Sequence, residues 1–254
     1  MKKFLFSFLL LLPIGIAAQI NQSDTLNFKA NLAVTGFWQG GNVETIIFRI
    51  KSDLSWRPSR TSVFKTSNSY VYQEFGRVKA DSDILSLNFL YFNPERKIYP
   101  LLLGFVSTSF RREIDLRYLL GAGLSFQLIK HKKNWLNCSV TGEYEKTNFA
   151  STNFNREAYN GSEVINTIRG TLWINGKYYL FKDKMIFSHE SYFQPSLVEN
   201  DNFRWQLDLG LEFPIWKFLN FKISHRSTYE SIVVTNQQQS DQILSFGFSA
   251  TTVQ

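Results

Sequence analysis

Two pairs of side chains in this sequence have the types and spacing for nucleophilic chemistry. His189 lies two residues before Ser191, and His225 lies two residues before Ser227. Residues two apart share one face of an extended strand, so each histidine could act as a base toward its serine. No third residue that would orient either histidine is evident, and such pairs arise often by chance. We therefore predict that the chain is not an enzyme; an outer-membrane lipid hydrolase or acyltransferase that uses these pairs is the alternative.

Other chemistries find little support. His131, His189 and His225 fall on a turn and two separate strands, whereas a metal site needs clustered ligands, so we predict no metal and no cofactor. Cys138 is the only cysteine, which excludes an internal disulfide. The formal net charge is +7, but the basic residues are scattered among acids without a basic run. This pattern argues against a nucleic-acid partner.

Charged side chains at alternating positions of long segments are better candidates for function. If those segments are strands, the charges share one face and would line a water-filled interior. The predicted lining residues are Arg49, Lys51, Asp53, Arg117, Glu143, Arg169, Arg204, Asp208, Glu212, Lys222 and Arg226. Mixed signs on neighbouring strands can pair across the sheet and fill a narrow interior. A selective pore is the competing interpretation.

The elements that would position these charges are clearest between Phe203 and Tyr229. Apolar residues from Phe203 to Phe213 alternate with polar ones such as Arg204, and the alternation resumes after a turn at 214–217. Strict period-two alternation predicts strands with one apolar and one polar face. These strands are longer than the roughly five or six residues of a typical strand. Their length matches the roughly 9–11 residues that a tilted strand needs to cross a bilayer.

Twelve segments follow this rule. The predicted strands are Leu26–Phe37, Glu44–Trp56, Ser62–Glu74, Ile84–Phe92, Ile98–Phe110, Leu116–Ile129, Trp135–Lys146, Val164–Tyr179, Met185–Gln194, Phe203–Phe213, Leu219–Tyr229 and Gln242–Thr252. Segment 84–92 has its apolar residues on one side, while segment 98–110 is apolar on both faces in its first half, which leaves its facing open.

The connections between these segments alternate in length. Short turns alternate with polar loops at 76–83, 147–162, 195–202 and 231–241. This asymmetry is expected of outer-membrane barrels. We predict an all-β fold, a closed antiparallel transmembrane β-barrel of twelve strands. A soluble exported β-barrel binding protein, with its apolar face inward, is the alternative.

The N-terminus predicts export. Lys2 and Lys3 precede an apolar run that ends in Ala17 and Ala18, which is the pattern of a secretory signal peptide. We predict a signal peptide over residues 1–18 and a single barrel domain over residues 19–254. The predicted location is the bacterial outer membrane. The predicted partners are outer-membrane lipid including lipopolysaccharide, and the barrel-assembly machinery during biogenesis, with the protein itself a monomer.

The chain resembles the YdiY-like salt-induced outer-membrane proteins, a family defined by a domain of unknown function. The resemblance rests on the turn 41–45, on Arg112, Arg117 and the segment 120–124, on the hairpin 203–229, and on Asp241 before the last strand. The family implies no agreed activity and no catalytic residues. The sequence departs from related barrels at its end, Thr251-Thr252-Val253-Gln254, where an aromatic residue is usual.

The strand number predicts a modest interior. Twelve strands enclose more space than the eight that side chains can just fill, and less than the open porins. We expect a narrow, mostly plugged passage for ions or small solutes, or a structural envelope component. The predicted lining has more bases than acids, which would favour anions slightly.

Overall fold

The fold is one antiparallel sheet of consecutive strands. This computed structural model describes residues 28–41, 44–131, 133–216 and 219–250. The strands in this part of the chain are β1 (Phe28–Gln39), β2 (Thr45–Ser59), β3 (Ser62–Phe75), β4 (Val78–Phe92), β5 (Ile98–Ser109), β6 (Ile114–Lys130), β7 (Trp135–Phe149), β8 (Val164–Leu180), β9 (Met185–Pro195), β10 (Phe203–Trp216), β11 (Leu219–Glu230) and β12 (Ser240–Ala250). Each strand pairs with the next in sequence. The all-β antiparallel prediction is confirmed.

Helical structure contributes little. A single turn of 3-10 helix, η1 (Glu157–Tyr159), lies in the connection between β7 and β8. Among the described residues, no helix is long and apolar enough to cross a membrane.

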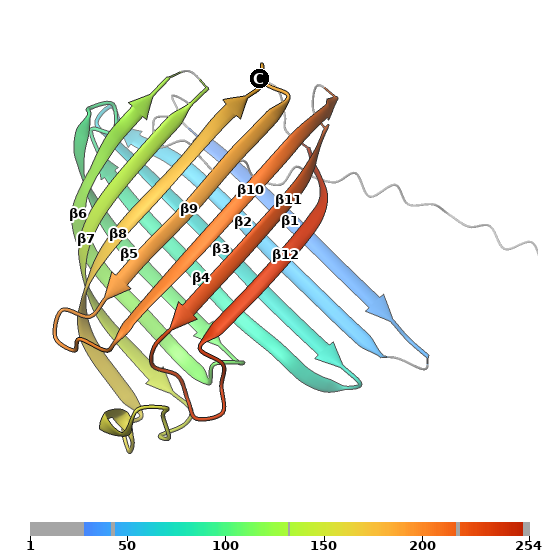
Figure 1. The fold of residues 1–254 in the computed structure, drawn as a ribbon, viewed down its shortest axis with the longest axis vertical. Helices are drawn as coiled ribbons and strands as arrows, with labels where there is room; N and C mark the ends of the chain where they lie inside the picture. Colours follow the sequence, from blue (N-terminus) through green and yellow to red (C-terminus); the bar gives the residue numbers. More distant parts are fainter. Residues whose placement is uncertain (1–27, 42–43, 132, 217–218, 251–254) are drawn as a thin grey trace, which may run out of the picture.

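The sheet curls strongly, as Figure 1 shows. Arg117 on β6 is hydrogen-bonded to Glu230 on β11, five strands away in the sheet order. The rings of Phe89 on β4 and Trp173 on β8 have their centroids 6.1 Å apart. Both contacts lie on the concave face. No pairing between β1 and β12 occurs in the described part of the chain, so closure and the total strand number stay predictions.

The two ends of the sheet differ in their connections. At one end, which we call the turn end, short turns join β2 to β3, β4 to β5, β6 to β7 and β8 to β9. At the other, the loop end, the longer connections 150–163, 196–202 and 231–239 lie together at the bottom of Figure 1.

The predicted loop at 76–83 is wrong. β4 begins at Val78, and only Gly76 and Arg77 separate it from β3. Both have positive φ, 57° and 63°, which is the geometry of a tight hairpin turn of type I′. The charges that suggested a loop belong to the strand itself: Asp81 is 4% exposed because it points into the interior.

Alternation along β7 shows how the sequence fixes the two faces. Glu143 and Glu145 are 2% and 1% exposed, whereas Val140 and Tyr144 are 51% and 47% exposed. The charged side chains therefore lie on the concave face and the apolar ones on the convex face. The same arrangement holds on β6 and β8, where Arg117 and Arg169 are buried as the alternation requires.

The region around β3 to β5 departs from this rule. Its concave face carries a packed apolar cluster. The cluster consists of Val63, Tyr91, Tyr99, Leu101 and Leu103, with Leu87, Phe89 and Trp173 packed against it. The apolar side of segment 84–92 thus faces the interior, where it forms a hydrophobic core of the kind that soluble sheets bury.

Two glycines allow β6 and β7 to approach closely. A side chain at Gly121 would collide with the backbone of Gly142, and one at Gly123 would collide with the backbone of Val140. Their role is therefore close strand packing.

Candidate functional site

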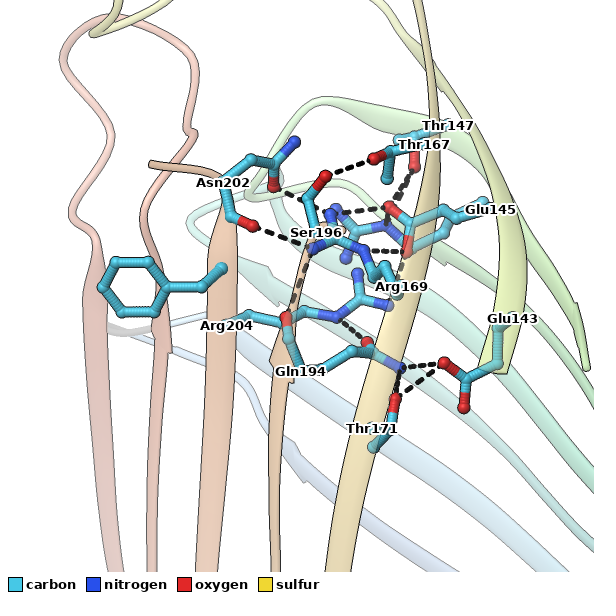
Figure 2. Close-up of polar contacts among 12 residues, drawn as sticks. Glu143, Glu145, Thr147, Thr167, Arg169, Thr171, Gln194, Ser196, Asn202 and Arg204 are labelled. Carbon is cyan, nitrogen blue, oxygen red and sulfur yellow. Dashed lines mark hydrogen bonds and ion pairs between the residues drawn. The ribbon is translucent and has the colours of Figure 1, made fainter. Parts of the chain in front are cut away.

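The charged interior at the loop end is the candidate site, and Glu145 lies at its centre. Arg169 Nε and Nη2 donate to the carboxylate of Glu145 at 2.8 and 3.2 Å, and Arg204 Nη2 donates at 2.6 Å (Figure 2). Arg117 Nε lies 3.8 Å from the same carboxylate. One glutamate from β7 thus gathers arginines from β6, β8 and β10, each placed by the inward parity of its strand.

Glu143, one inward position earlier on β7, is bound by neutral donors. Thr171 Oγ1 donates to it at 2.7 Å and Gln194 Nε2 at 3.4 Å, and Thr141 donates through its hydroxyl. Gln194 also accepts from Arg204 Nε at 2.5 Å, which joins the two carboxylate clusters (Figure 2).

A third carboxylate, that of Glu230, extends the network across the interior. Arg117 binds Glu230 through two parallel hydrogen bonds, from Nη1 at 2.8 Å and from Nη2 at 3.0 Å. Arg112 lies 3.6 Å from Glu230 and donates to Asp241 at 2.6 Å. Four arginines (112, 117, 169 and 204) thus face four carboxylates (143, 145, 230 and 241), so the network is close to neutral.

The connection 196–202 closes over this network. Arg169 Nη2 donates to Asn202 Oδ1 at 2.8 Å, and Ser196 Oγ shares a 2.6 Å hydrogen bond with Thr167 (Figure 2). Ser196 Oγ also accepts from the backbone of Val198 and Glu199. The loop is therefore held against the inner wall by the same charged residues that it covers.

Two longer loops form a lid above the site. Phe154, in 150–163, and Val234, in 231–239, form a β-bridge. Asn155 N donates to Val233 O at 3.0 Å, and Thr235 N donates to Asn153 O at 2.9 Å. An apolar cluster lies beneath this bridge. Its members are Ile114, Phe149, Phe154, Tyr159, Ile165, Ile232 and Val234.

The space left inside the network is small. A cavity of about 20 Å³ lies between the arginines, Glu145, Glu230 and two members of the apolar cluster, Phe149 and Ile232. This volume holds about one water molecule. Arg204 Nη1 is buried and has no hydrogen-bond partner among the described residues. The interior around Glu145 is thus filled by side chains, whereas a larger cavity of about 200 Å³ lies beside Arg112, Arg226 and Asp241.

The structure places the predicted lining residues in three groups. Arg117, Glu143, Arg169 and Arg204 belong to the network. The other charged pairs lie on the concave face between β10 and β11, with Arg226 Nε to Asp208 at 2.6 Å and Lys222 Nζ to Glu212 at 3.4 Å. The side chains of Arg49, Lys51 and Asp53 lie outside the described residues.

Several members of the network were not among the predicted residues. Glu145 could have been found, because it shares the inward parity of Glu143 on the same strand. Glu230 and Asp241 share the inward face of Arg204 and Arg226, but each lies one residue outside the predicted bounds of its strand. Arg112 lies in a short loop, where alternation gives no signal. Gln194 is uncharged, so a search for charges passes over it.

The proposed nucleophile pairs show no catalytic geometry. His189 stacks on Tyr178 with centroids 5.8 Å apart, and Ser191 Oγ points to the carbonyl of Ile174 at 3.4 Å. In the described part of the chain, no hydrogen bond joins Ser191 or Ser227 to a histidine. Nor do these residues include a group of three or more His, Cys, Asp or Glu side chains that could hold a metal ion.

Comparison with known proteins identifies the family. The model of DUF481, described as a protein of unknown function, matches residues 41–251. The chain belongs to this family. The resemblance to the YdiY-like proteins is thereby confirmed. Comparison with curated proteins gave no significant match.

A solved structure supports the fold of this DUF481 protein. The NanC porin, in a rhombohedral crystal form, superimposes with a TM-score of 0.51 at 11% sequence identity. The match covers 86% of this chain and 98% of the porin chain. At this identity the likeness shows a porin-like fold and nothing about the solute.

Proposed function

We propose that this DUF481 protein is an integral outer-membrane β-barrel of twelve strands, closed by pairing of β12 with β1, with an interior sealed at the loop end. The convex face carries the proposal. Leu120, Val140 and Ile168 are 63%, 51% and 51% exposed there, while the charges are buried on the opposite face. Lipid makes an apolar outer surface of this kind favourable, and lipid cannot satisfy an open sheet edge.

Aromatic residues at both ends of the strands support the same proposal. Near the loop end, Trp38 and Phe75 are 76% and 48% exposed. Near the turn end, Trp56, Phe181 and Trp216 are 49%, 72% and 68% exposed. Rings at these two levels match the aromatic girdles of membrane barrels. The proposed location is therefore the outer membrane, reached by export through the signal segment 1–18.

The contents of the interior suggest its role. The charge network and the lid fill the interior around Glu145 at the loop end, and the apolar cluster fills it beside β3 to β5 nearer the turn end. A cavity of about 200 Å³ beside Arg112, Arg226 and Asp241 is the space that remains for a narrow passage. The protein is in this proposal a closed passage of low conductance for ions or small solutes, monomeric and surrounded by outer-membrane lipid. Selectivity is weak, because Glu145, Glu230 and Asp241 offset the surplus of bases in the predicted lining.

We infer that the chain has no catalytic role. The proposal is supported by the stacking of the His189 ring on Tyr178 and by the contact of Ser191 Oγ with the carbonyl of Ile174, which direct the two side chains to partners other than each other. Phospholipid cleavage by the purified protein, lost on His189→Ala or His225→Ala, would overturn it.

Membrane integration can be tested directly. The protein should fractionate with outer membranes, resist extraction with alkaline carbonate, and migrate differently on a gel before and after boiling. Release by carbonate or salt would contradict the proposal and favour a soluble exported barrel.

A further inference from the structure

Charged side chains are unevenly distributed between the two ends of the sheet. At the turn end, the described residues of 57–61, 93–97, 130–134 and 181–184 include eight basic side chains and two acids, a net charge of +6 (8 − 2). At the loop end, the connections 40–44, 76–77, 110–113, 150–163, 196–202 and 231–239 include four bases and six acids, a net charge of −2 (4 − 6). The site described above does not involve the turn-end charges.

We call the eight bases the turn-end collar. They are Arg57, Arg60, Arg96, Lys97, Lys130, Lys133, Lys182 and Lys184. Only part of the collar is neutralised: Glu95 pairs with Arg57 at 2.9 Å and lies 3.7 Å from Lys130, and Asp183 pairs with Lys133. Arg60, Arg96 and Lys97 are exposed and form no ion pair within the described residues.

A groove at this end combines the collar with the aromatic girdle. It has a volume of about 510 Å³ and is lined by Phe28, Trp56, Arg57, Ser59 and Arg60. Phe28 and Trp56 face each other across β1 and β2 and are 60% and 49% exposed. The groove therefore has an apolar wall on the side of the strands and the exposed guanidinium group of Arg60 at the tip of the turn, whereas Arg57 beside it is paired with Glu95.

We propose that this groove and the collar around it bind the phosphate head groups of anionic phospholipids in the leaflet that surrounds the turn end. Arginine matches phosphate oxygens with paired hydrogen bonds. Tryptophan and phenylalanine at the interface pack against the glycerol and the start of the acyl chains. The inference rests on the proposed membrane insertion, because insertion places the collar beside the head groups. An acidic soluble protein would use the charges but not the aromatic wall.

The test is native mass spectrometry of the full-length protein, released from detergent in the presence of phosphatidylglycerol or phosphatidylcholine with identical acyl chains. We expect tighter retention of phosphatidylglycerol. Arg60→Gln should lower this affinity about fivefold, which is the effect of about one charge at an anionic surface. The matched control is Arg156→Gln at the loop end, whose ion pair with Asp201 is long at 4.0 Å, and it should leave the affinity unchanged.

Four results would overturn the inference: equal retention of the two lipids, an equal loss in Arg156→Gln, displacement of phosphatidylglycerol by millimolar inorganic phosphate, or equally tight binding of soluble polyglutamate. The last two would indicate a free phosphate and an acidic protein, respectively. Insertion into pure phosphatidylcholine vesicles separates this inference from the proposed function. A protein that inserts without a lipid preference contradicts only the inference, and a protein that does not insert contradicts the proposed function.

Discussion

The interior of the sheet is filled in two different ways. Beside β7 to β11 it holds arginines and carboxylates in a hydrogen-bonded network, and beside β3 to β5 it holds a packed apolar cluster. Both regions lie on the same concave face, and both bury their side chains almost completely. The comparison shows that the alternation along each strand determines which side chains are buried. The neighbouring strands determine whether those side chains are stabilised by ion pairs or by apolar packing.

The largest effect should come from removing the central charge of the network. Glu145→Gln leaves the buried Arg169 and Arg204 without their counter-charge, which should lower the free energy of unfolding by about 3–5 kcal/mol. Urea titration in detergent, followed by tryptophan fluorescence, measures it. The matched control is Glu143→Gln, whose donors are neutral and whose amide oxygen can still accept; an equal loss in both variants would contradict a special role for Glu145.

The apolar region should respond to lost packing. Leu101 is 2% exposed within its cluster, so Leu101→Ala should cost about 2–5 kcal/mol of unfolding free energy through the cavity it creates. The adjacent Leu102, 46% exposed on the convex face, provides the control. Leu102→Ala should cost clearly less, and a reversed order would show that the facing of β5 is wrong.

The facing of β5 illustrates which side-chain orientations can be predicted from the sequence and which cannot. The alternation predicted that Arg117, Glu143, Arg169 and Arg204 share one face, because the side-chain period of a strand is two and only one face can meet charge. Where both faces are apolar, as in the first half of β5, polar and apolar residues no longer alternate. Lipid on the outside and a hydrophobic core on the inside are then equally favourable for the same side chains. Their facing then depends on which strands meet across the interior.

Contacts across the interior of the sheet could not be predicted from the sequence either. The pair Arg117 and Glu230 depends on how tightly the sheet curls over five strands, and no local pattern encodes that curvature. The start of β4 was missed for another reason: Lys79, Asp81 and Asp83 are as polar as a loop, yet Asp81 is buried in the interior. Charge alone therefore does not distinguish a loop from an inward-facing strand.

A substitution in the lid should lower stability less than the changes above. It should nevertheless raise permeability measurably. Phe154 is 4% exposed and its ring packs edge-on against Phe149 with centroids 4.9 Å apart. Phe154→Ala should loosen the contact between the two loops and raise ion current across a planar bilayer. Phe75→Ala, at an exposed ring of the loop end, should leave the current unchanged. Similar currents from both variants would mean that the lid does not seal the interior.

The smallest effect concerns pH. Burial raises the pKa of Tyr159 to about 12, and the carboxylate of Glu199, which accepts its hydroxyl at 3.1 Å, adds to the shift. The folded protein thus favours the neutral phenol. The stabilisation is complete below the unfolded pKa of about 10 and is lost as the pH rises from there through about 12. The difference in unfolding free energy between the native chain and Tyr159→Phe should shrink over this range; a constant difference would contradict the assignment.

The central claim, that the loop end of the interior is sealed by the charge network and the lid, is tested most directly by conductance of the full-length protein in a planar bilayer. The account predicts insertion without large steady currents, and small, weakly selective openings at most. Large, continuous currents of the size that open porins carry would contradict it.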